Sequence, residues 1–360
     1  MKRRQLIAAG SALALSACAE PSRKAPTGSG APRFEWKMVT SWPRDLPGLG
    51  TGAARLAEML GEASGGRLRV TLYAGNELVA PFDVFDAVAR GAVEMGHSGA
   101  YYWKGKSEAA PFFCAMPFGL NAQEMNGWLY HGGGLALWRE LYAKFGLVPF
   151  PCGNTGVQMA GWFNREILSV DDLKGLKMRI PGLAGDVMAR LGVVPVNLPG
   201  GDIFHSLQQG AIDAAEWMSP YNDLAFGLHR VAKYCYYPGW QEPGPTLECI
   251  VNQHAYAALP DDLKAILDAC CRAINADLLA EYTVRNQDAL KQLIDVHKVE
   301  FRRLPDPVLA ALREQADAIL AELATRDPFT KRVHDSFVAF RERARAWAAV
   351  SEVPFFQSRT

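Results

Sequence analysis

Two polar side chains lie in stretches that are otherwise apolar, and their chemistry suits the binding of a small organic acid. Gln158 falls in the run 153–163 and Arg179 in the run 176–182, and each is expected inside an apolar strand. Polar groups in such places are costly unless something pairs with them. An arginine offers a planar set of donors that fits a carboxylate, and a glutamine offers an oxygen to a cation. The competing interpretation is an internal pair between Arg179 and an acidic residue of the same chain.

Two glutamates further along the chain complete a mixed site. Glu216 ends a phrase expected to be a strand, and Glu242 lies in the run 234–245. That run is rich in Pro, Gly, Tyr and Trp, and it is expected to form a ligand-facing loop without regular structure. One arginine beside two acids predicts that Arg179 clamps a carboxylate while the glutamates and Gln158 hold a hard cation. The cation would offset repulsion between the acids and the ligand, and it would select ligands with a second oxygen beside the carboxylate.

A phrase of helix, glycine and strand occurs twice and gives these residues their expected places. Residues 85–94 align with 204–213, and in each an aromatic residue opens the phrase and a glycine closes the helix six residues later. The first copy leads to Tyr101 and Tyr102, and the second leads to Glu216. Ligands of open α/β sheets lie beyond the carboxyl ends of strands, so the pattern predicts a cleft between two α/β halves. Chance recurrence of so short a phrase is the competing interpretation.

The remaining pattern predicts a mixed α/β chain. Strands are expected at 34–40 and 68–72 around a helix at 52–62, which is the order of a βαβ unit. Further elements are expected at 83–90 (helix), 92–99 (strand), 127–145 (helix-rich), about 259–299 (long helix) and 308–324 (helix). The last helix carries an apolar seam of Val333, Phe337, Phe340, Ala344 and Trp347. So narrow a seam fits either the helix of a partner chain or an internal amphipathic helix.

The start of the chain and its charge balance indicate export and exclude some classes of partner. Residues 1–19 are expected to be a signal peptide, and Arg3-Arg4 also suits twin-arginine export. Cys18 fits a lipoprotein cleavage box and is a possible lipid anchor, although ordinary signal cleavage fits as well. Residues 20–32 are expected to form a flexible tether. With 38 basic and 38 acidic residues, the chain has no excess of positive charge that would indicate binding to nucleic acid, and no basic stripe that would bind anionic lipid.

Motifs of common enzymes and metal centres are missing from the sequence. It contains no phosphate-binding Gly-rich loop, no His-Glu-x-x-His and no complete nucleophile elbow. The six cysteines after Cys18 include no CxxC pair, which argues against zinc. Buried free thiols are expected for most of them, with Cys235–Cys249 as the nearest candidate disulfide. Glu216 and Glu242 could still serve as the acid and base of a periplasmic hydrolase or lyase, which is the alternative function.

Several of these stretches together resemble the solute-binding subunits of TRAP transporters, and above all their 2-oxoacid and monocarboxylate-binding branch. The motifs are YYWKGK at 101–106, the run 153–163, MRIPG at 178–182, the run 207–220 and PGWQEPG at 238–244. The resemblance covers nearly all of the chain after the leader. It implies a two-lobed periplasmic solute-binding protein of α/β class, with several crossings between lobes, a long spanning helix and a C-terminal helix.

The resemblance also implies what the site binds and how. Arg179 would form the salt bridge to the carboxylate of a 2-oxo- or 2-hydroxy-monocarboxylate, such as pyruvate or lactate. A metal ion, Na⁺ or alternatively Ca²⁺, would be held by Gln158, Glu216, the Trp217 carbonyl and Glu242, with Gln241 as the second choice for the last position. Tyr101 and Tyr102 would contribute from the other lobe. No chemistry on the ligand is expected.

Lobes and partners follow from the same resemblance. Lobe I is expected to comprise 33–155 and about 246–300, and lobe II 156–245 and about 301–330. Residues 331–360 would form a C-terminal helix exchanged between the two chains of a homodimer. The membrane subunits of the transporter would receive the solute in the periplasm. A ligand-sensing extracytoplasmic module with the same pocket is a further alternative.

Overall fold

The computed structural model describes residues 32–359 of the chain. The expected signal peptide, Cys18 and the expected tether except Pro32 lie outside the described residues, as does Thr360. Residues from Arg33 onward form one compact unit. Within residues 32–359, no helix combines the length and the apolar character needed to cross a membrane.

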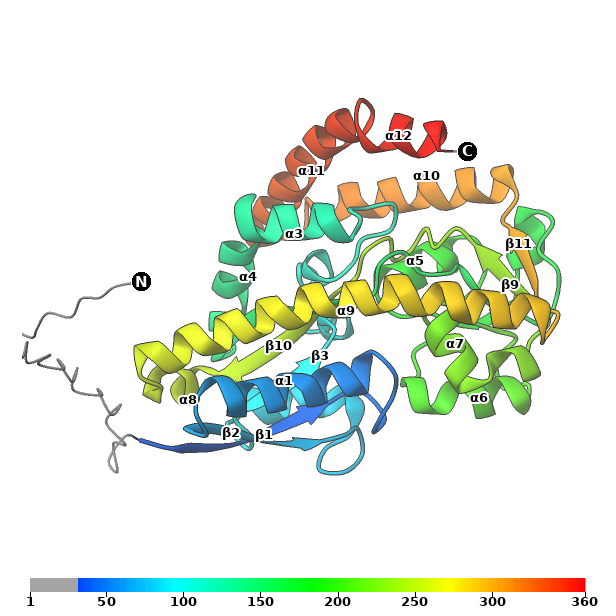
Figure 1. The fold of residues 1–360 in the computed structure, drawn as a ribbon. Helices are drawn as coiled ribbons and strands as arrows, with labels where there is room; N and C mark the ends of the chain where they lie inside the picture. The colour runs from blue at the N-terminus through cyan, green and yellow to red at the C-terminus, as the bar shows by residue number, and fades with distance from the viewer. Residues whose placement is uncertain (1–31, 360) are drawn as a thin grey trace, which may run out of the picture. The chain divides into compact units, whose positions relative to one another are not determined.

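Two β-sheets form the frame of this unit (Figure 1). The first has the order β2-β1-β3-β10-β4 and consists of β1 (Phe34–Thr40), β2 (Leu68–Tyr73), β3 (Met95–Ser98), β4 (Leu147–Asn154) and β10 (Thr246–Asn252). The second has the order β11-β9-β5-β8-β6-β7 and consists of β5 (Gly161–Phe163), β6 (Lys177–Arg179), β7 (Val194–Val196), β8 (Ala214–Ala215), β9 (Tyr234–Tyr237) and β11 (Glu300–Arg303). The chain enters the second sheet between β4 and β5, returns between β9 and β10, and enters it again at β11.

Helices surround both sheets. They are α1 (Leu49–Ala63), α2 (Val84–Ala89), α3 (Ala122–His131), α4 (Gly134–Ala143), α5 (Gly182–Arg190), α6 (Gly200–Gln208), α7 (Pro220–Phe226), α8 (Gln253–Ala258), α9 (Asp261–Asp295), α10 (Asp306–Leu323), α11 (Pro328–Ala348) and α12 (Glu352–Ser358). Short 3₁₀ turns occur at η1 (Pro81–Asp83), η2 (Ala100–Trp103), η3 (Ala110–Phe113), η4 (Val170–Leu173) and η5 (Leu228–Arg230).

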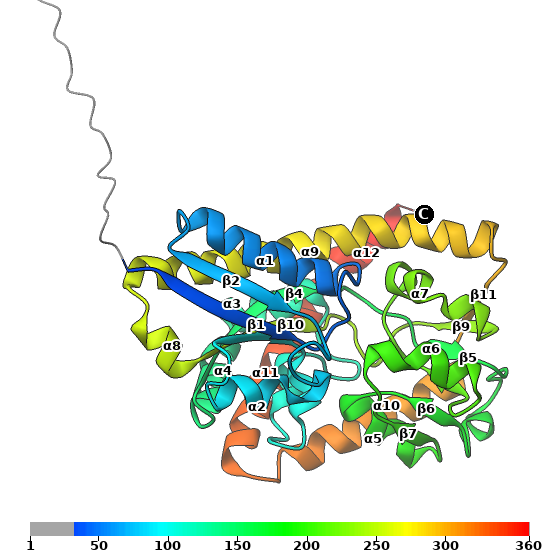
Figure 2. The ribbon, with the colours of Figure 1, turned by 90° about the horizontal axis from the view of Figure 1, so that it is seen from below.

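The long helix α9 connects the two halves that the sheets define. It packs against β4 and α1 of the first half and against α7 of the second (Figures 1 and 2). Leu263, Leu267, Ile274, Leu278 and Tyr282 form its buried face, at the spacing expected of a helix with one apolar side. The predicted long helix is therefore confirmed, and it ends at Asp295.

The repeated phrase takes equivalent places in the two halves. In the first, α2 ends near Gly91 and leads into β3, which runs parallel to β1. In the second, α6 ends near Gly210 and leads into β8, which runs parallel to β6. Both glycines have a φ of 70°, a left-handed conformation that glycine adopts without strain at the end of a helix. The prediction of two similar helix–glycine–strand units is confirmed.

Three expectations about local structure are wrong. Gln158 does not lie inside a strand, because β4 ends at Asn154 and β5 begins only at Gly161. The run 234–245 is not wholly irregular, because its tyrosine-rich start forms β9 and pairs with β5 and β11. The candidate disulfide is not formed, since Cys235 lies in the second sheet and Cys249 in the first, and both thiols are free and buried.

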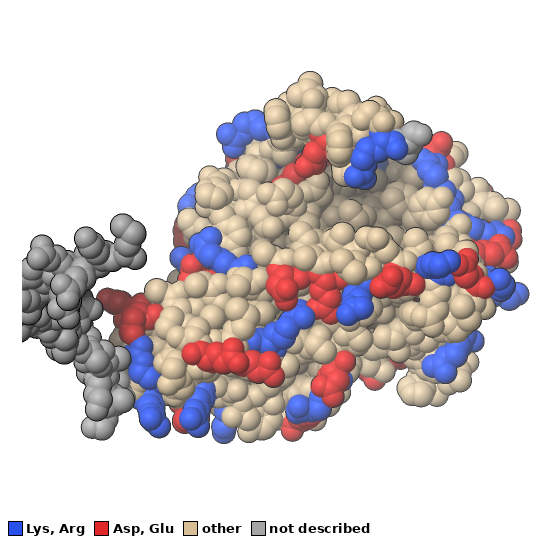
Figure 3. Space-filling view, viewed as in Figure 1, with Lys and Arg blue, Asp and Glu red and all other residues tan. Residues whose placement is uncertain are grey.

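The C-terminal seam is internal for part of its length. Val333 and Phe337 of α11 are fully buried, and α11 packs against α3, α4 and α10. Trp347, at the end of the same helix, is 68% exposed. On the face shown in Figure 3, acidic and basic side chains are interspersed.

Candidate functional site

Strand register brings the central arginine and the first glutamate together. Arg179 is the last residue of β6 and pairs with Ala215 of β8, so that Glu216 follows directly on the neighbouring parallel strand. Arg179 Nη1 donates to the carboxylate Oε2 of Glu216 at 2.8 Å and to its backbone oxygen at 2.6 Å. Each side chain is only 1% exposed. This pair at the carboxyl ends of two parallel strands forms the floor of the site.

The guanidinium of Arg179 is only partly engaged by the chain. Its Nε donates to the backbone oxygen of Leu198 at 3.1 Å, and its face lies 5.2 Å from the Trp217 ring. Its Nη2 is buried and has no hydrogen-bond partner in the part of the chain that the structure describes. The internal pair between Arg179 and an acid, which was the alternative to ligand binding, is therefore formed. One nitrogen of the guanidinium is still available for a ligand. A full two-nitrogen fork is not free in this arrangement, because Nη1 is occupied by Glu216.

The two crossings that flank the second sheet bring the remaining predicted residues to the same place. The backbone nitrogen of Gln158 donates to the backbone oxygen of Glu242 at 3.2 Å. The amide Nε2 of Gln241 donates to the backbone oxygen of Met159 at 2.7 Å. Two loops distant in sequence thus hold each other, and both deliver side-chain oxygens to the region of Arg179. Gln158, Gln241 and Glu242 are all buried.

Six buried polar atoms in this small region have no hydrogen-bond partner among residues 32–359. They are Arg179 Nη2, Trp217 Nε1, Gln158 Oε1, Gln241 Oε1, Glu216 Oε1 and Glu242 Oε2. Each such atom costs roughly 1–3 kcal/mol when it is left unpaired, and native proteins leave few of them. The set contains two donors and four oxygens, which is complementary to an anion accompanied by a cation.

The electrostatics of the two acids favour the uptake of positive charge. Burial raises the pKa of Glu216 to about 7, although Arg179 and Gln241 oppose the shift. Burial and the neighbouring Glu216 raise the pKa of Glu242 well above its usual value, and Arg179 opposes this shift too. For Arg179 itself, burial lowers the pKa, but the surrounding tyrosines and acids outweigh burial and raise it. Two buried carboxyls with one arginine therefore require a proton or a cation for balance.

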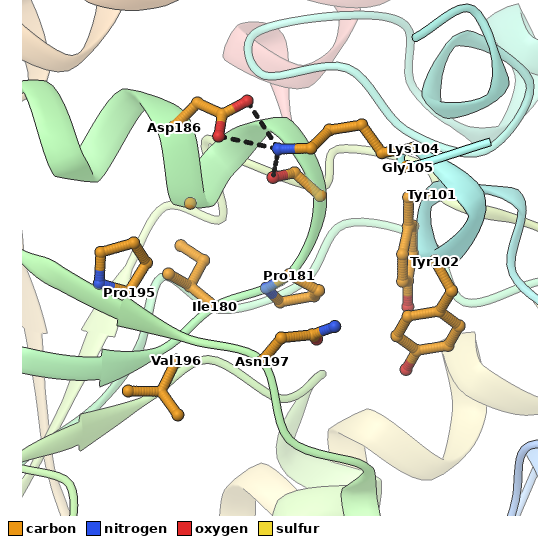
Figure 4. Close-up of a pocket in the computed structure, with 12 residues that line it drawn as sticks. Tyr101, Tyr102, Lys104, Gly105, Ile180, Pro181, Asp186, Pro195, Val196 and Asn197 are labelled. Carbon is orange, nitrogen blue, oxygen red and sulfur yellow. Dashed lines mark hydrogen bonds and ion pairs between the residues drawn. The ribbon is translucent and has the colours of Figure 1, made fainter. Parts of the chain in front are cut away.

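The tyrosines approach this floor from the first half. Tyr101 and Tyr102 belong to η2, which follows β3 directly, and their rings meet edge to face with centroids 4.6 Å apart. Burial raises the pKa of Tyr101, with Tyr102 and Glu242 adding to the shift and Arg179 opposing it. Both tyrosines line a hollow of about 420 Å³, opposite Pro181 and Asn197 (Figure 4). They form one wall of this hollow, and Ile180 and Pro181, which directly follow Arg179, line its other side.

The oxygen donors suit a hard cation. Among residues 32–359, no group of three or more His, Cys, Asp or Glu residues could hold a metal ion. The donors available here are two carboxylates and two amide oxygens, all four with an unpartnered oxygen. Such oxygen donors fit Na⁺ or Ca²⁺ far better than a thiophilic metal.

Some parts of the site lack a clear signal in the sequence. Asn197 and the Leu198 oxygen come from the link between β7 and α6, which carries no recognisable motif. Gly200 offers an indirect signal, because a Cβ at this position would lie 2.2 Å from the Trp217 ring. On its other side the Trp217 ring stacks on Phe226 at 5.1 Å. The indole is thus fixed between α6, Phe226 and Arg179.

Comparisons with known proteins agree with one another at the level of sequence. The family model of bacterial extracellular solute-binding proteins, family 7 (DctP), matches residues 39–327. A monocarboxylate 2-oxoacid-binding periplasmic protein from Nostoc sp. is 43% identical over 359 residues, which is 99% of this chain and 98% of that protein.

Two solved structures extend this likeness to the fold. A TRAP periplasmic solute-binding protein from Pseudoalteromonas atlantica, with bound sodium and pyruvate, is 41% identical with a TM-score of 0.88, covering 91% of this chain and 99% of its own. A TRAP transporter solute-binding protein from Bordetella bronchiseptica is 38% identical with a TM-score of 0.90, covering 91% and 98%. It is a mixed-occupancy dimer with copurified calcium and picolinate in one active site and an apo second site.

Proposed function

Because the chain belongs to the DctP family of TRAP solute-binding proteins, we propose that it captures a small 2-oxo- or 2-hydroxy-monocarboxylate together with a metal ion. The observation that carries this proposal is the set of six unpartnered buried atoms around Arg179. Its two N–H donors suit a carboxylate, and its four oxygens suit a cation. Both partners together would satisfy groups that the protein leaves unpaired.

In the proposed complex, Arg179 Nη2 donates to the carboxylate of the ligand. Gln158, Glu216, the Trp217 carbonyl and Glu242 hold the cation, and Gln241 is the second choice for the position of Glu242. A bound cation would neutralise the buried acids and would bind oxygen atoms of the ligand. Na⁺ is the first expectation and Ca²⁺ the alternative, as in the relatives with pyruvate and picolinate.

The ligands of the two relatives support this substrate class. Pyruvate has a carbonyl oxygen next to its carboxylate, and picolinate has a ring nitrogen in the same position. Each can therefore bind a cation through two neighbouring atoms. A 2-hydroxy acid such as lactate offers the same arrangement, whereas acetate and propionate lack the second donor. The proposed preference follows from chelation rather than from the size of the pocket.

The same family assignment leads to proposals on the assembly. Lobe I comprises 33–155 and about 246–300, and lobe II comprises 156–245 and about 301–330, with η2 and Arg179 on opposite sides of the cleft. The loaded protein delivers its solute to the two membrane subunits of a TRAP transporter in the periplasm. Two chains form a homodimer through 331–360, and Cys18 is a candidate lipid anchor.

The experiment is binding of pyruvate to protein freed of metal with a chelator. Isothermal titration calorimetry should detect binding only after Na⁺ or Ca²⁺ is restored, and native mass spectrometry should show one acid and one cation per chain. Lactate should bind and acetate should not. Absence of binding with either cation, or equal binding without one, would refute the proposal. Turnover of pyruvate or lactate would instead support a periplasmic hydrolase or lyase.

Two neighbouring variants test the cation ligands in the same assay. Glu242→Gln should lose the cation, because it removes one of two carboxylates, and with it most of the affinity for pyruvate. Gln241→Leu tests the second choice for the same position and should retain the cation, although it also removes the hydrogen bond from Nε2 to the Met159 oxygen. If Gln241→Leu loses the cation while Glu242→Gln keeps it, the assignment of the fourth ligand is reversed.

A further inference from the structure

An ion pair links the two halves of the molecule at the mouth of the site. Lys104 directly follows η2 of the first half, and Asp186 lies in α5 of the second. The ammonium Nζ of Lys104 lies 2.7 Å and 2.8 Å from the two carboxylate oxygens of Asp186 (Figure 4). It also lies 3.5 Å from the backbone oxygen of Gly182. One side chain thus reaches three acceptors on the opposite half.

The backbones of the two halves come close at the same place. Gly182 begins α5 with a φ of 64°, and a Cβ added to it would meet the Cβ of Tyr101 at 3.3 Å. Tyr101 lies three residues before Lys104, and Gly182 lies three residues after Arg179. The ion pair therefore closes the contact between the segment that carries the tyrosines and the segment that carries the arginine. Any movement of η2 away from α5 has to break it.

The pair separates two hollows on the surface. Lys104 and Asp186 line the hollow of about 420 Å³ beside the tyrosines. They also line a second hollow of about 300 Å³, together with Glu108 and Arg326. Water has access from both sides, and the two side chains are 33% and 46% exposed. An ion pair with this exposure has a modest strength, so its effect is expected on rates rather than on whether the protein folds.

We propose that Lys104 and Asp186 are positioning residues that hold Tyr101 and Tyr102 over the bound acid and slow its release. This inference rests on the proposed function of the site. The pair joins groups on opposite halves, so it must break before the ligand leaves, and its loss speeds dissociation. In the ligand-free protein the same pair favours the closed arrangement of the two halves.

The test is stopped-flow release of pyruvate from the full chain loaded with Na⁺ or Ca²⁺. Lys104→Met and Asp186→Asn should each speed release about two- to fivefold at low salt. The double variant should release no faster than the single variants, because both remove the same interaction. The charge-reversed variant Lys104→Asp/Asp186→Lys should recover slow release in part. In 0.5 M NaCl the differences should shrink, since salt screens a half-exposed pair.

A matched control is available two residues along the chain. Lys106 pairs with Asp86 of α2 at 2.7 Å within the first half, so Lys106→Met should leave release unchanged. Equal release from wild type and Lys104→Met, or additive effects of the two single variants, would overturn the inference.

A failure of the proposed function would be visible separately, as wild-type protein that does not bind pyruvate. In that case small-angle X-ray scattering of the ligand-free protein decides whether the pair holds the halves together. Lys104→Met should then increase the radius of gyration relative to wild type and Lys106→Met. An unchanged radius in Lys104→Met would overturn the inference.

Discussion

A single guanidinium has three tasks in the site, and this sets what a substitution can do. Arg179 Nη1 holds Glu216, Nε holds the Leu198 oxygen, and Nη2 remains free. A lysine has one ammonium that cannot reach all three positions. Loss of a buried hydrogen-bonded charge partner typically costs 2–5 kcal/mol. Arg179→Lys should therefore weaken pyruvate binding by about 30-fold or more in calorimetry.

Two measurements separate the clamp from damage to the fold. Circular dichroism and thermal unfolding of Arg179→Lys should show a folded protein, because the lysine still neutralises Glu216. Arg165→Lys is the control, since Arg165 lies on the surface, where its Nη2 donates to the backbone oxygen of Lys174. Affinity within threefold of wild type in folded Arg179→Lys would contradict the role of Arg179 in holding the carboxylate.

Residue types indicate which side chains the structure gathers around Arg179 better than they indicate how these side chains pair. Arg179, Glu216 and Glu242 stand out because charged groups are rare in apolar stretches. An internal pair of Arg179 with an acid was one of two interpretations, but the identity of Glu216 as that acid could not be predicted, because it depends on β6 and β8 being neighbouring strands. The sequence also could not predict which side-chain oxygens of Gln241 and Glu242 are unpartnered, because that depends on the conformation of their loop.

At the scale of elements, a buried carboxylate ties η2 to the first half. Glu248 of β10 accepts hydrogen bonds from Trp103 Nε1 of η2 at 2.5 Å and from the Tyr142 hydroxyl of α4 at 2.7 Å. Burial raises the pKa of Glu248 from 4.5 to about 7, although both hydrogen bonds oppose the shift. Glu248 therefore anchors the tyrosine segment from within, on the side away from Lys104.

The raised pKa of Glu248 predicts how stability changes with pH. Between pH 4.5 and 7 the folded state holds a proton on Glu248 that the unfolded state has lost, so the free energy of unfolding falls as pH rises through this window. Glu248→Gln cannot lose a proton in this window, so its free energy of unfolding should not fall in this way, and the amide can keep both hydrogen bonds. Between pH 5 and pH 8, the free energy of unfolding of the variant should therefore rise by about 2–3 kcal/mol relative to that of the wild type, measured by urea unfolding. For the exposed control Glu62→Gln, the free energy of unfolding should not rise relative to wild type. A difference between Glu248→Gln and wild type that stays constant from pH 5 to pH 8 would contradict the prediction.

The sequence predicts helices and strands well where the apolar residues keep a single spacing, either that of a helix or that of a strand. The strand at β1 and the helices α1, α9 and α10 match their predicted ranges to within a few residues. β9 was missed because Pro and Gly residues directly after Tyr237 suggested a loop, whereas the strand ends just before them. The residues of β4 and β5 form one continuous apolar stretch in the sequence, which predicts a strand at Gln158. In the structure a turn around Gly156 separates the two strands.

At the scale of the molecule, the two-lobed fold was predictable because a repeated helix–glycine–strand phrase and family motifs cover most of the chain. The solved relatives confirm that fold and its place among TRAP solute-binding proteins. The ion pair beside the tyrosines was not predictable, since Lys104 and Asp186 are 82 residues apart, and the motif that contains Lys104 does not indicate a partner for it. Contacts of this kind depend on how the two halves close.

The C-terminal segment leads to the last prediction, which concerns assembly. Trp347, Val350, Phe355 and Phe356 are between 54% and 74% exposed, and apolar groups gathered in this way commonly mark an interface. The proposed homodimer would cover them with a second copy of the chain.

Light scattering after size-exclusion chromatography should give twice the chain mass for wild type. Trp347→Asp/Phe356→Asp should give one chain mass with pyruvate binding unchanged, because the cleft lies in other elements. Leu168 is also 68% exposed but lies between β5 and η4, so Leu168→Asp should remain dimeric. A monomeric wild type at tens of micromolar would rule out this interface.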